Sequence, residues 1–218
     1  MSLRKNQLVD GEIYHIFTKS IEGFSIFNSP KDFSRMANLF YFYSFKNMPC
    51  KFSVYMKKEK EKENEKSFFS QNDKIIKIIA YCIMPTHIHL VLQQVETEGV
   101  STFMNRVLLS YTKYFNLKYK RKGPLWESRF KNVLVLSDEQ LLHLTRYVHL
   151  NPVTAFLVNT PLNWKFSSFN EYIDSNDSIK VCDFRDFLDI NQQEYKKFVE
   201  DNTDYQRTLG KLKKLLLE

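Results

Sequence analysis

The chain has 218 residues, of which 43% are hydrophobic and 15% aromatic, a composition that supports a buried core and does not indicate disorder. Its formal net charge of +7 favours an anionic partner such as nucleic acid. Three widely spaced cysteines argue against a disulfide framework or a zinc ribbon, and neither a signal peptide nor an apolar run of membrane-spanning length occurs. We therefore expect a soluble cytoplasmic protein that does not enter the membrane.

The first third of the chain predicts a strand, a helix and a charged insertion. Residues 11–21 alternate in polarity and are rich in β-branched and aromatic residues, which is typical of a strand. Ser29 and Pro30 form a helix start, and apolar residues then recur at helical spacing. Residues 56–66 alternate in charge sign with little net charge, so we expect a solvated insertion or hairpin tip rather than a nucleic-acid arm.

The middle of the chain predicts three strands and two helices. Residues 74–85 and 87–95 are apolar runs joined by a short turn, as in adjacent antiparallel strands. A long helix follows Gly99, with Phe103, Val107, Tyr111 and Phe115 on its apolar stripe, and residues 131–136 form a fourth strand. Residues 137–151 begin with a capping box and form a helix of about four turns that stops at Pro152.

This order of elements predicts the fold class. Strand, helix, strand, strand, helix, strand spells the ferredoxin-like split βαβ pattern, an α+β fold in which helices cover a central antiparallel sheet. We expect residues 1–160 to form the main domain, which includes the helix 137–151. Residues 161–218 are expected to form a C-terminal helical extension that packs on it, and they end in a terminal helix over residues 209–218.

Two histidines on the second predicted strand of the middle region point to a metal site. His87 and His89 are two residues apart on a strand, so their side chains point to the same face while Ile88 and Leu90 point to the other. Their Cα atoms are then about 6.6 Å apart, and two imidazoles at that spacing can converge on one cation. Two ligands do not complete a site, so a third group is needed.

The helix 137–151 offers that group. Tyr147 and Asn151 are four residues apart and therefore lie on one helix face. A phenol is a poor nucleophile near neutral pH, but a divalent cation that polarises a phosphate makes attack by a phenol in line with it feasible. The amide oxygen of Asn151 is a candidate further ligand, although the following Pro152 biases the backbone of Asn151 away from helical geometry.

Three motifs that follow one another in the chain resemble a known family. The stretches "AYCIMPTHIHLVLQ", "GPLWESRFKNVLV" and "RYVHLNPV", followed by "NWKFSSF", resemble the REP-associated tyrosine transposases, a branch of the single-tyrosine HUH endonuclease-transposases. His87, Ile88 and His89 match the HUH motif, in which U is a bulky apolar residue. The resemblance covers residues 11–173 and does not extend to the last 45 or so residues.

The resemblance implies a function and a set of site residues. Such an enzyme is a metal-dependent endonuclease and strand transferase that cleaves single-stranded DNA near hairpins and forms a 5′-phosphotyrosine intermediate. Tyr147 would be the nucleophile, and His87, His89 and Asn151 would hold Mg²⁺ or Mn²⁺. By softness, imidazole ligands suit zinc or manganese better than magnesium. We expect a monomer, because the relatives are able to work alone.

Basic and aromatic residues between positions 113 and 131 predict a single-strand DNA contact, since cations neutralise phosphates and rings stack on unpaired bases. Trp126 and Arg129 also belong to the resembling motif. The predicted contacts are Lys118, Arg121, Lys122, Trp126, Arg129 and Lys131.

Four alternatives stand beside this interpretation, and the last of them is poor. Tyr111 and Tyr114 lie on the helix that follows Gly99 and compete with Tyr147 as nucleophile. We favour Tyr147, because the spacing of Tyr111 and Tyr114 matches the apolar stripe by which that helix packs on the core. The protein is alternatively a domesticated nucleic-acid-binding module without catalysis, or a zinc phosphoesterase that uses water and forms no covalent adduct. A histidine-triad hydrolase needs a third alternating histidine where the chain has Val91.

Overall fold

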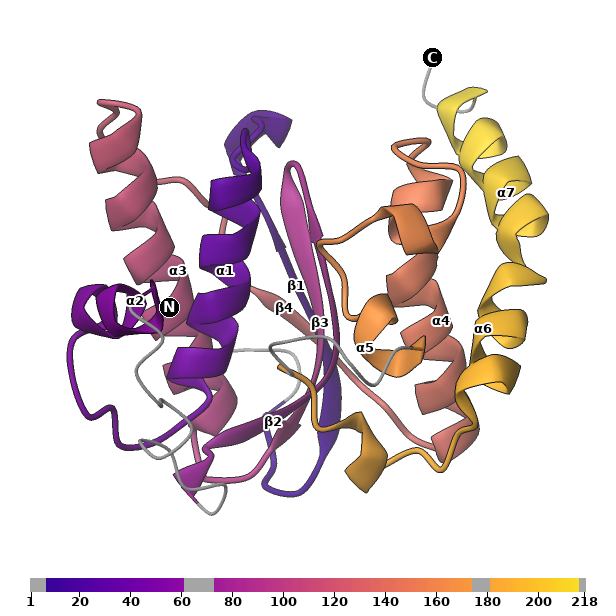
Figure 1. Ribbon diagram of the computed structural model, residues 1–218, viewed down its shortest axis with the longest axis horizontal. Helices are drawn as coiled ribbons and strands as arrows, with labels where there is room; N and C mark the ends of the chain where they lie inside the picture. Colours follow the sequence, from indigo (N-terminus) through magenta and orange to yellow (C-terminus); the bar gives the residue numbers. More distant parts are fainter. Residues whose placement is uncertain (1–6, 61–72, 174–180, 216–218) are drawn as a thin grey trace.

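The computed structural model describes residues 7–60, 73–173 and 181–215. A central sheet, seen edge-on in Figure 1, separates a layer formed by α1, α2 and α3 from a layer formed by α4, α5, α6 and α7. The helices and strands are β1 (Ile13–Lys19), α1 (Pro30–Tyr43), α2 (Phe52–Lys60), β2 (Ile76–Met84), β3 (His87–Gln94), α3 (Gly99–Lys118), β4 (Lys131–Leu134), α4 (Asp138–Thr154), α5 (Phe169–Ile173), α6 (Gln192–Glu200) and α7 (Thr203–Leu215). Short 3-10 turns are η1 (Ile21–Gly23), η4 (Pro161–Asn163) and η5 (Phe184–Asp186).

The sheet has the topology that the order of elements predicted. Its strands lie in the order β2-β3-β1-β4, and each neighbouring pair is antiparallel. This is the arrangement of a split βαβ unit, in which β3 returns between the two strands that α1 connects. The predicted ferredoxin-like α+β fold is confirmed.

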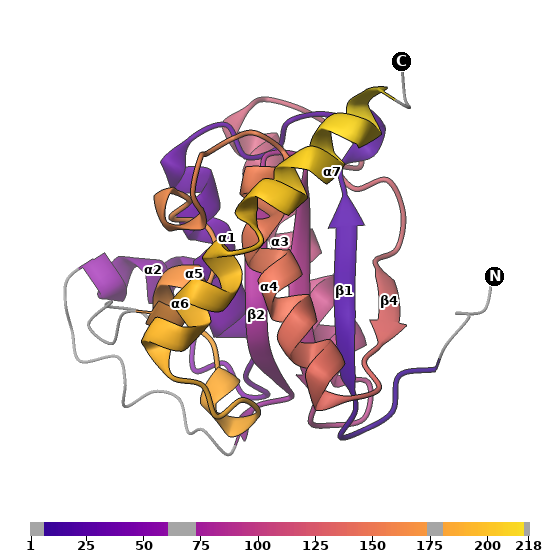
Figure 2. The ribbon, with the colours of Figure 1, turned by 90° about the vertical axis from the view of Figure 1, so that its right-hand side faces the viewer.

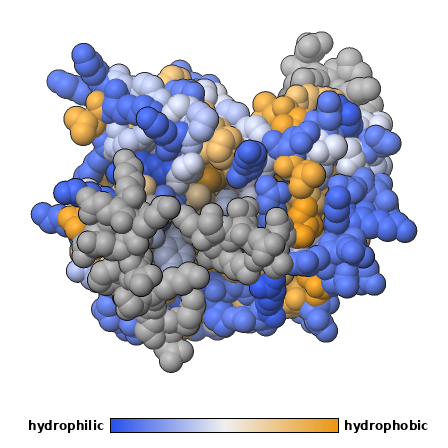
Figure 3. All heavy atoms as spheres, in the orientation of Figure 1, coloured by the Kyte–Doolittle hydropathy of each residue, from blue (hydrophilic) through white to orange (hydrophobic). Residues whose placement is uncertain are grey.

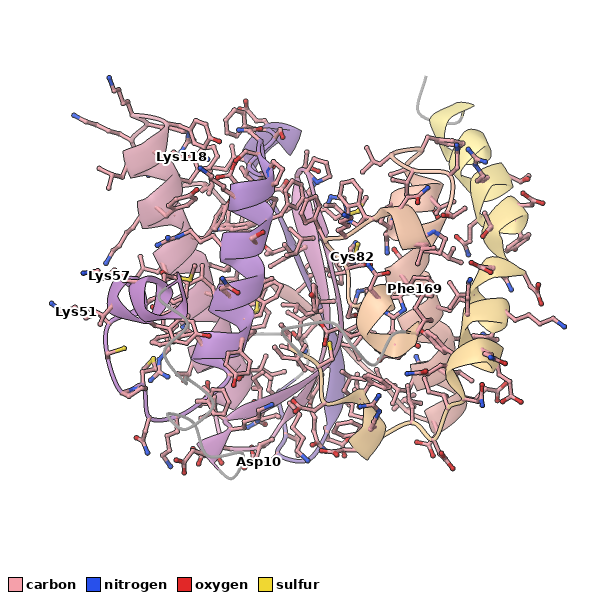
Figure 4. All side chains as sticks on the ribbon, in the orientation of Figure 1. Asp10, Lys51, Lys57, Cys82, Lys118 and Phe169 are labelled. Atoms are coloured by element: carbon pink, nitrogen blue, oxygen red, sulfur yellow. The ribbon has the colours of Figure 1, made fainter. Side chains whose placement is uncertain are left out.

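Alternation along the strands divides the core into two clusters. Ile88, Leu90 and Leu92 of β3 are fully buried on the face that α1 and α3 cover. Val91, on the alternate face, packs in the second cluster with residues of α4 and with Phe169 of α5. Cys82 and Phe169 mark this second cluster between the sheet and α4 in Figure 4. The two clusters pack on opposite faces of the sheet. The backbone of β3 is therefore held in place, and so are the side chains that it carries.

The second helical layer covers only part of its face of the sheet. Helix α4 packs on β2 and β3. In Figure 2, α4 crosses the sheet while β1 and β4 remain in view beside it. The side chain of Val133 in β4 is accordingly 48% exposed. One half of this sheet face is therefore open along an edge of α4.

Three boundaries differ from the sequence predictions. Helix α4 does not stop before Pro152 but continues to Thr154. Pro152 and Val153 are buried in the packed layer, and this burial compensates for the backbone bond that proline cannot make. Strand β4 ends at Leu134 rather than residue 136, and α7 begins at Thr203 rather than residue 209.

The charged stretch 56–66, predicted as a solvated insertion or hairpin tip, lies only partly within the described residues. Residues 56–60 continue α2, and residues 61–66 lie outside the described part of the chain. Residues 56 and 57 are half-buried and exposed, respectively, and the prediction of a solvated insertion stays a prediction for the rest of the stretch.

The surface of the protein is mostly polar, with hydrophobic residues gathered in one strip. Most of the face seen in Figure 3 is hydrophilic, and hydrophobic spheres gather in a strip on the side of α4 and α6. Among the described residues, no helix combines the length and the apolar character needed to cross a lipid bilayer.

Candidate active site

The two histidines of β3 lie side by side on the face that α4 partly covers. His87 is the first residue of the strand, and both side chains point away from the cluster under α1 and α3. Their ring centroids are 5.1 Å apart, with the ring planes almost perpendicular. His89 is buried and His87 is half-buried. The predicted pair on one face is therefore present, at the open half of the sheet.

A third histidine, His15 of β1, contacts the pair. Strand β1 runs antiparallel to β3 with Phe17 opposite His89, so His15 lies diagonally across from His89 on the same face. The Nε2 atom of His15 is 3.0 Å from the Nδ1 atom of His89, and the two rings are nearly parallel. The three imidazoles form one row across two strands.

Burial keeps the three imidazoles neutral. It lowers the pKa of His15 to about 4 and that of His89 well below its ordinary value, to which the neighbouring histidines add. Burial also lowers the pKa of His87, and Lys19 adds to this shift. Neutral imidazole is the form that binds metal ions.

Hydrogen bonds select which ring nitrogens remain available to a metal. The Nδ1 atom of His87 lies 2.9 Å from Oγ1 of Thr86, and the Nδ1 atom of His89 lies 3.0 Å from His15. Each histidine of the pair thus uses Nδ1 within the protein, which leaves Nε2 as the ring nitrogen that a metal could bind. This is the usual arrangement of metal-binding histidines, in which the second nitrogen is held by a neighbouring group.

Tyr147 reaches the histidines from a separate element. Its ring centroid is 5.8 Å from that of His89 and 6.0 Å from that of His15, in both cases edge to face. The side chain is 38% exposed. Burial raises the pKa of Tyr147, and a hydrogen bond with Asn151 partly opposes this rise. The phenol is therefore protonated near neutral pH and accessible to a substrate.

A buried hydrogen-bond network anchors the helix that carries Tyr147. His149, on the inner side of α4, bonds through Nδ1 to the hydroxyl of Tyr195 in α6 and through Nε2 to the hydroxyl of Ser168, both at 2.8 Å. Ser168 in turn accepts the backbone N–H of Tyr81 in β2. Because the network ties α4 to the sheet and to α6, the position of Tyr147 is fixed by several elements.

Asn151 lies one helical turn after Tyr147. Its Nδ2 atom donates to the carbonyl oxygen of Tyr147 at 3.0 Å and lies 3.5 Å from that of Val148. The Val148 carbonyl would ordinarily accept the N–H that Pro152 lacks, so the amide takes the place of a missing helix bond. The donor atom is used by the backbone, which leaves Oδ1 as the oxygen that a hard cation prefers.

The two histidines would bind a divalent cation only as part of an open site. Within the three described ranges, no three histidine, cysteine or acidic side chains are grouped so as to hold a metal ion. His15 is bonded to His89 and does not serve as a third imidazole ligand. His87 and His89 supply two imidazole nitrogens, and a cation bound there would need further ligands, for which the amide oxygen of Asn151 and oxygen atoms of a substrate are candidates.

A pocket of about 280 Å³ opens beside the histidines. Its walls come from the end of β1, the turn before β3, and the segment 127–131. Arg129 and Lys131, two of the residues predicted to contact DNA, line it together with His87 and His89. The structure thus brings two of the six predicted DNA contacts to the predicted metal ligands.

Comparisons with known proteins show what this chain is similar to. Residues 50–151 match the family model described as "Transposase IS200 like", a stretch that contains both histidines and Tyr147 and ends at Asn151. A curated protein of Haemophilus influenzae with the provisional name of a REP-associated tyrosine transposase is 32% identical over 103 residues. That match covers 42% of this chain and 58% of the relative, so the chain spans little more than half of the relative's length.

A solved structure extends the comparison to the fold. A REP-associated tyrosine transposase bound to a REP hairpin matches 88% of this chain and 99% of its own, with a TM-score of 0.54 and 15% identity. By sequence and by fold, the chain resembles the REP-associated tyrosine transposases. The family resemblance that the sequence motifs predicted is confirmed.

The other predicted transposase residues lie elsewhere. The indole of Trp126 is half-buried and donates to the Leu108 carbonyl and the Thr112 hydroxyl of α3. Lys118, at the end of α3 in Figure 4, donates to the buried carboxylate of Asp32 at 2.6 Å. Arg121 lies near Asn116 and the Gly123 carbonyl, and Lys122 is exposed on the loop that follows α3.

The competing tyrosines are on the far side of the sheet. Tyr111 is fully buried in the cluster under α1 and α3, where its hydroxyl donates to the Ile26 carbonyl at 2.7 Å. Tyr114 donates to the carboxylate of Asp32. Both therefore serve packing and hydrogen bonding away from the histidine row.

Sequence reasoning missed His15 and Phe17. A signal was present, because residues 13, 15, 17 and 19 alternate in the first predicted strand just as residues 87 and 89 do in the other. Only the pairing of β1 with β3 places both residues beside His89, and strand pairing is not contained in alternation alone.

Proposed function

We propose that the protein is a metal-dependent single-stranded DNA endonuclease and strand transferase in which Tyr147 is the nucleophile. The observation that carries this proposal is the edge-to-face contact of Tyr147 with His89, whose ring centroids are 5.8 Å apart although they come from α4 and β3. An accessible phenol beside His89, one of the two neutral imidazoles that could hold a cation, suits transesterification at a phosphodiester.

The residues have distinct roles in this reaction. His87 and His89, with the amide oxygen of Asn151, would hold Mg²⁺ or Mn²⁺ through the atoms that their hydrogen bonds leave available. A bound divalent cation would draw charge from the scissile phosphate and orient it. His15 would be a positioning residue, because with a cation on Nε2 of His89 the proton is on Nδ1, which lies 3.0 Å from Nε2 of His15 and would donate to it.

The step itself exchanges one phosphate ester for another. The phenolic oxygen of Tyr147 forms a bond to phosphorus, the bond from phosphorus to the 3′-oxygen breaks, and the phenolic proton is balanced by protonation of that oxygen. The products are a 5′-phosphotyrosine link and a free 3′-hydroxyl. Attack by a 3′-hydroxyl on the link reverses the exchange and rejoins strands without an external energy source.

We further propose hairpin-bearing single-stranded DNA as the substrate class. A solved structure of similar fold carries a REP hairpin, and the pocket beside the histidines of this chain is lined by Arg129 and Lys131. Cations beside an open groove suit a phosphate backbone. Because the described residues form the site from one chain, we propose that a monomer is sufficient.

The test is to incubate the protein with hairpin-bearing single-stranded DNA and Mn²⁺ and to look for a covalent adduct on a denaturing gel. We expect Tyr147→Phe to abolish the adduct and the matched variant Tyr205→Phe, at an exposed tyrosine of α7, to retain it. Tyr111→Phe is also expected to retain it. Cleavage without an adduct would favour a water-using phosphoesterase, and DNA binding without cleavage would favour a non-catalytic module.

A further inference from the structure

The pocket beside the histidines has an aromatic floor that the proposed chemistry does not use. It is lined by Phe17, Thr18, Lys19, Gly23, Thr86, His87, His89, Glu127, Ser128, Arg129 and Lys131. Phe17 is the aromatic residue other than histidine in this lining. Its ring is half-buried and faces the same side of the sheet as the histidines.

Phe17 lies in a row across the sheet between a metal-binding residue and a cation. In the register of the strands it is opposite His89 in β3 on one side and opposite Lys131 in β4 on the other. Neighbouring strands are about 4.8 Å apart, so the row presents an imidazole, a phenyl ring and an ammonium group in steps of about that length. The ring centroids of Phe17 and His89 are 6.1 Å apart, with planes only 28° from parallel.

The wall opposite β3 is held rigidly in place. The N–H of Glu127 donates to the Lys19 carbonyl at 3.0 Å, and the N–H of Ile21 donates to the Leu125 carbonyl at 3.1 Å. Between them, the indole of Trp126 is bonded to α3. The segment that carries Arg129 is therefore fixed against the end of β1, and the pocket is preformed.

The charges of the wall match a nucleotide. The lining carries three positive side chains and one negative side chain: Lys19, Arg129, Lys131 and Glu127. Glu127 forms an ion pair with Lys19 at 3.1 Å. Cations at the rim suit phosphate groups, and an aromatic ring inside suits the face of an unpaired base. A pocket of about 280 Å³ is of the size of one nucleotide rather than a duplex.

We propose that this pocket binds one unpaired base of the DNA next to the scissile phosphate, with Phe17 as the stacking surface. The proposal rests on the proposed function, since it takes single-stranded DNA as the substrate. It assigns to Phe17 a role in substrate binding and to Trp126 the positioning of the pocket wall.

Binding without cleavage tests the pocket by itself. Fluorescence anisotropy in the presence of EDTA would give the dissociation constants of a twelve-residue oligothymidylate and of an abasic strand of the same length. Stacking on one ring corresponds to about a tenfold change in affinity. We expect Phe17→Ala to weaken oligothymidylate binding about tenfold and to leave binding of the abasic strand unchanged.

Two variants control this experiment. Phe17→Tyr keeps the ring and should bind both strands as wild type does, which separates loss of stacking from loss of folding. Tyr205→Ala removes an exposed ring on α7 and should change neither constant. If Phe17→Ala weakens both strands equally, or neither, the base pocket is refuted.

The outcome is separable from the proposed function because the two readouts differ. Formation of the Tyr147 adduct is read on a denaturing gel with hairpin DNA and Mn²⁺. An adduct together with unchanged oligothymidylate binding in Phe17→Ala would overturn the pocket and leave the nuclease. If Phe17→Ala weakens binding of oligothymidylate alone and the wild-type protein forms no adduct with any hairpin, the base pocket is supported and the proposed nuclease activity is overturned.

Discussion

The Nε2 atom of His15 in β1 lies 3.0 Å from the Nδ1 atom of His89 in β3. For Nε2 of His89 to bind a cation, Nδ1 must carry the proton, and His15 is the group that accepts it. The contact therefore couples the first strand of the fold to the ligand chemistry of the third. We therefore expect removal of the His15 imidazole to weaken metal binding more than it destabilises the fold.

We expect His15→Ala to weaken Mn²⁺ binding by about 10- to 100-fold, because loss of a group that orients a metal ligand has effects of this size. His15→Gln, whose side-chain oxygen also accepts a hydrogen bond, should recover part of the loss. Isothermal titration of the DNA-free protein with Mn²⁺ measures both. His143→Ala, at an exposed histidine of α4, is the matched control, and an unchanged affinity in His15→Ala would contradict the orienting role.

Replacing either imidazole of the pair should separate cleavage from binding. His87→Ala and His89→Ala remove a proposed metal ligand but leave Arg129 and Lys131 in the pocket. We expect no adduct with hairpin DNA and Mn²⁺, and an affinity for the same DNA within a few-fold of wild type by anisotropy. A folded variant that no longer binds DNA would mean that the imidazoles serve recognition.

The basic residues should differ in how they depend on salt. Arg129→Ala and Lys131→Ala are each expected to weaken single-strand binding and to reduce the slope of log affinity against log salt by about 0.7, the value for one neutralised phosphate. Lys118→Ala should change the slope less, because its ammonium group is bonded to Asp32. If Lys118→Ala reduces the salt slope by about 0.7 and neither Arg129→Ala nor Lys131→Ala changes it, the DNA binds at the end of α3 instead.

The carboxylate of Asp32 should make stability depend on pH. Burial alone would raise the pKa of Asp32, but hydrogen bonds from Lys118, Tyr119, Tyr114 and Ser29 outweigh it and lower the pKa to about 2. A folded-state pKa below the unfolded value of about 3.9 stabilises the protein above pH 4, and this contribution is lost as the pH falls towards 2.

Asp32→Asn should therefore lower the free energy of unfolding by about 2 kcal/mol at pH 7, and by progressively less as the pH falls from 4 to 2. Urea denaturation of both proteins across this range measures the difference. Asp189→Asn, at an exposed carboxylate, should show no such dependence. A difference between wild type and Asp32→Asn that is constant with pH would refute the assigned cause.

Several residues show where prediction from sequence ended. The spacing of Ser29 and Pro30 located α1, and the stripe that includes Tyr111 located the buried side of α3. Trp126 was predicted to meet DNA because an aromatic residue among cations resembles a single-strand site, yet its indole is bonded to α3. Pro152 predicted a helix end, but burial against the core keeps α4 regular to Thr154.

The sequence by itself determined the local geometry of the site. Strand alternation placed His87 and His89 on one face, and helical periodicity placed Tyr147 one turn from Asn151, because both patterns depend on backbone repeat alone. Only the tertiary structure decided that α4 brings Tyr147 to His89, and that the register of β1 against β3 places His15 and Phe17 at the site. Those contacts depend on strand register and on burial shared between distant segments, which no local pattern encodes.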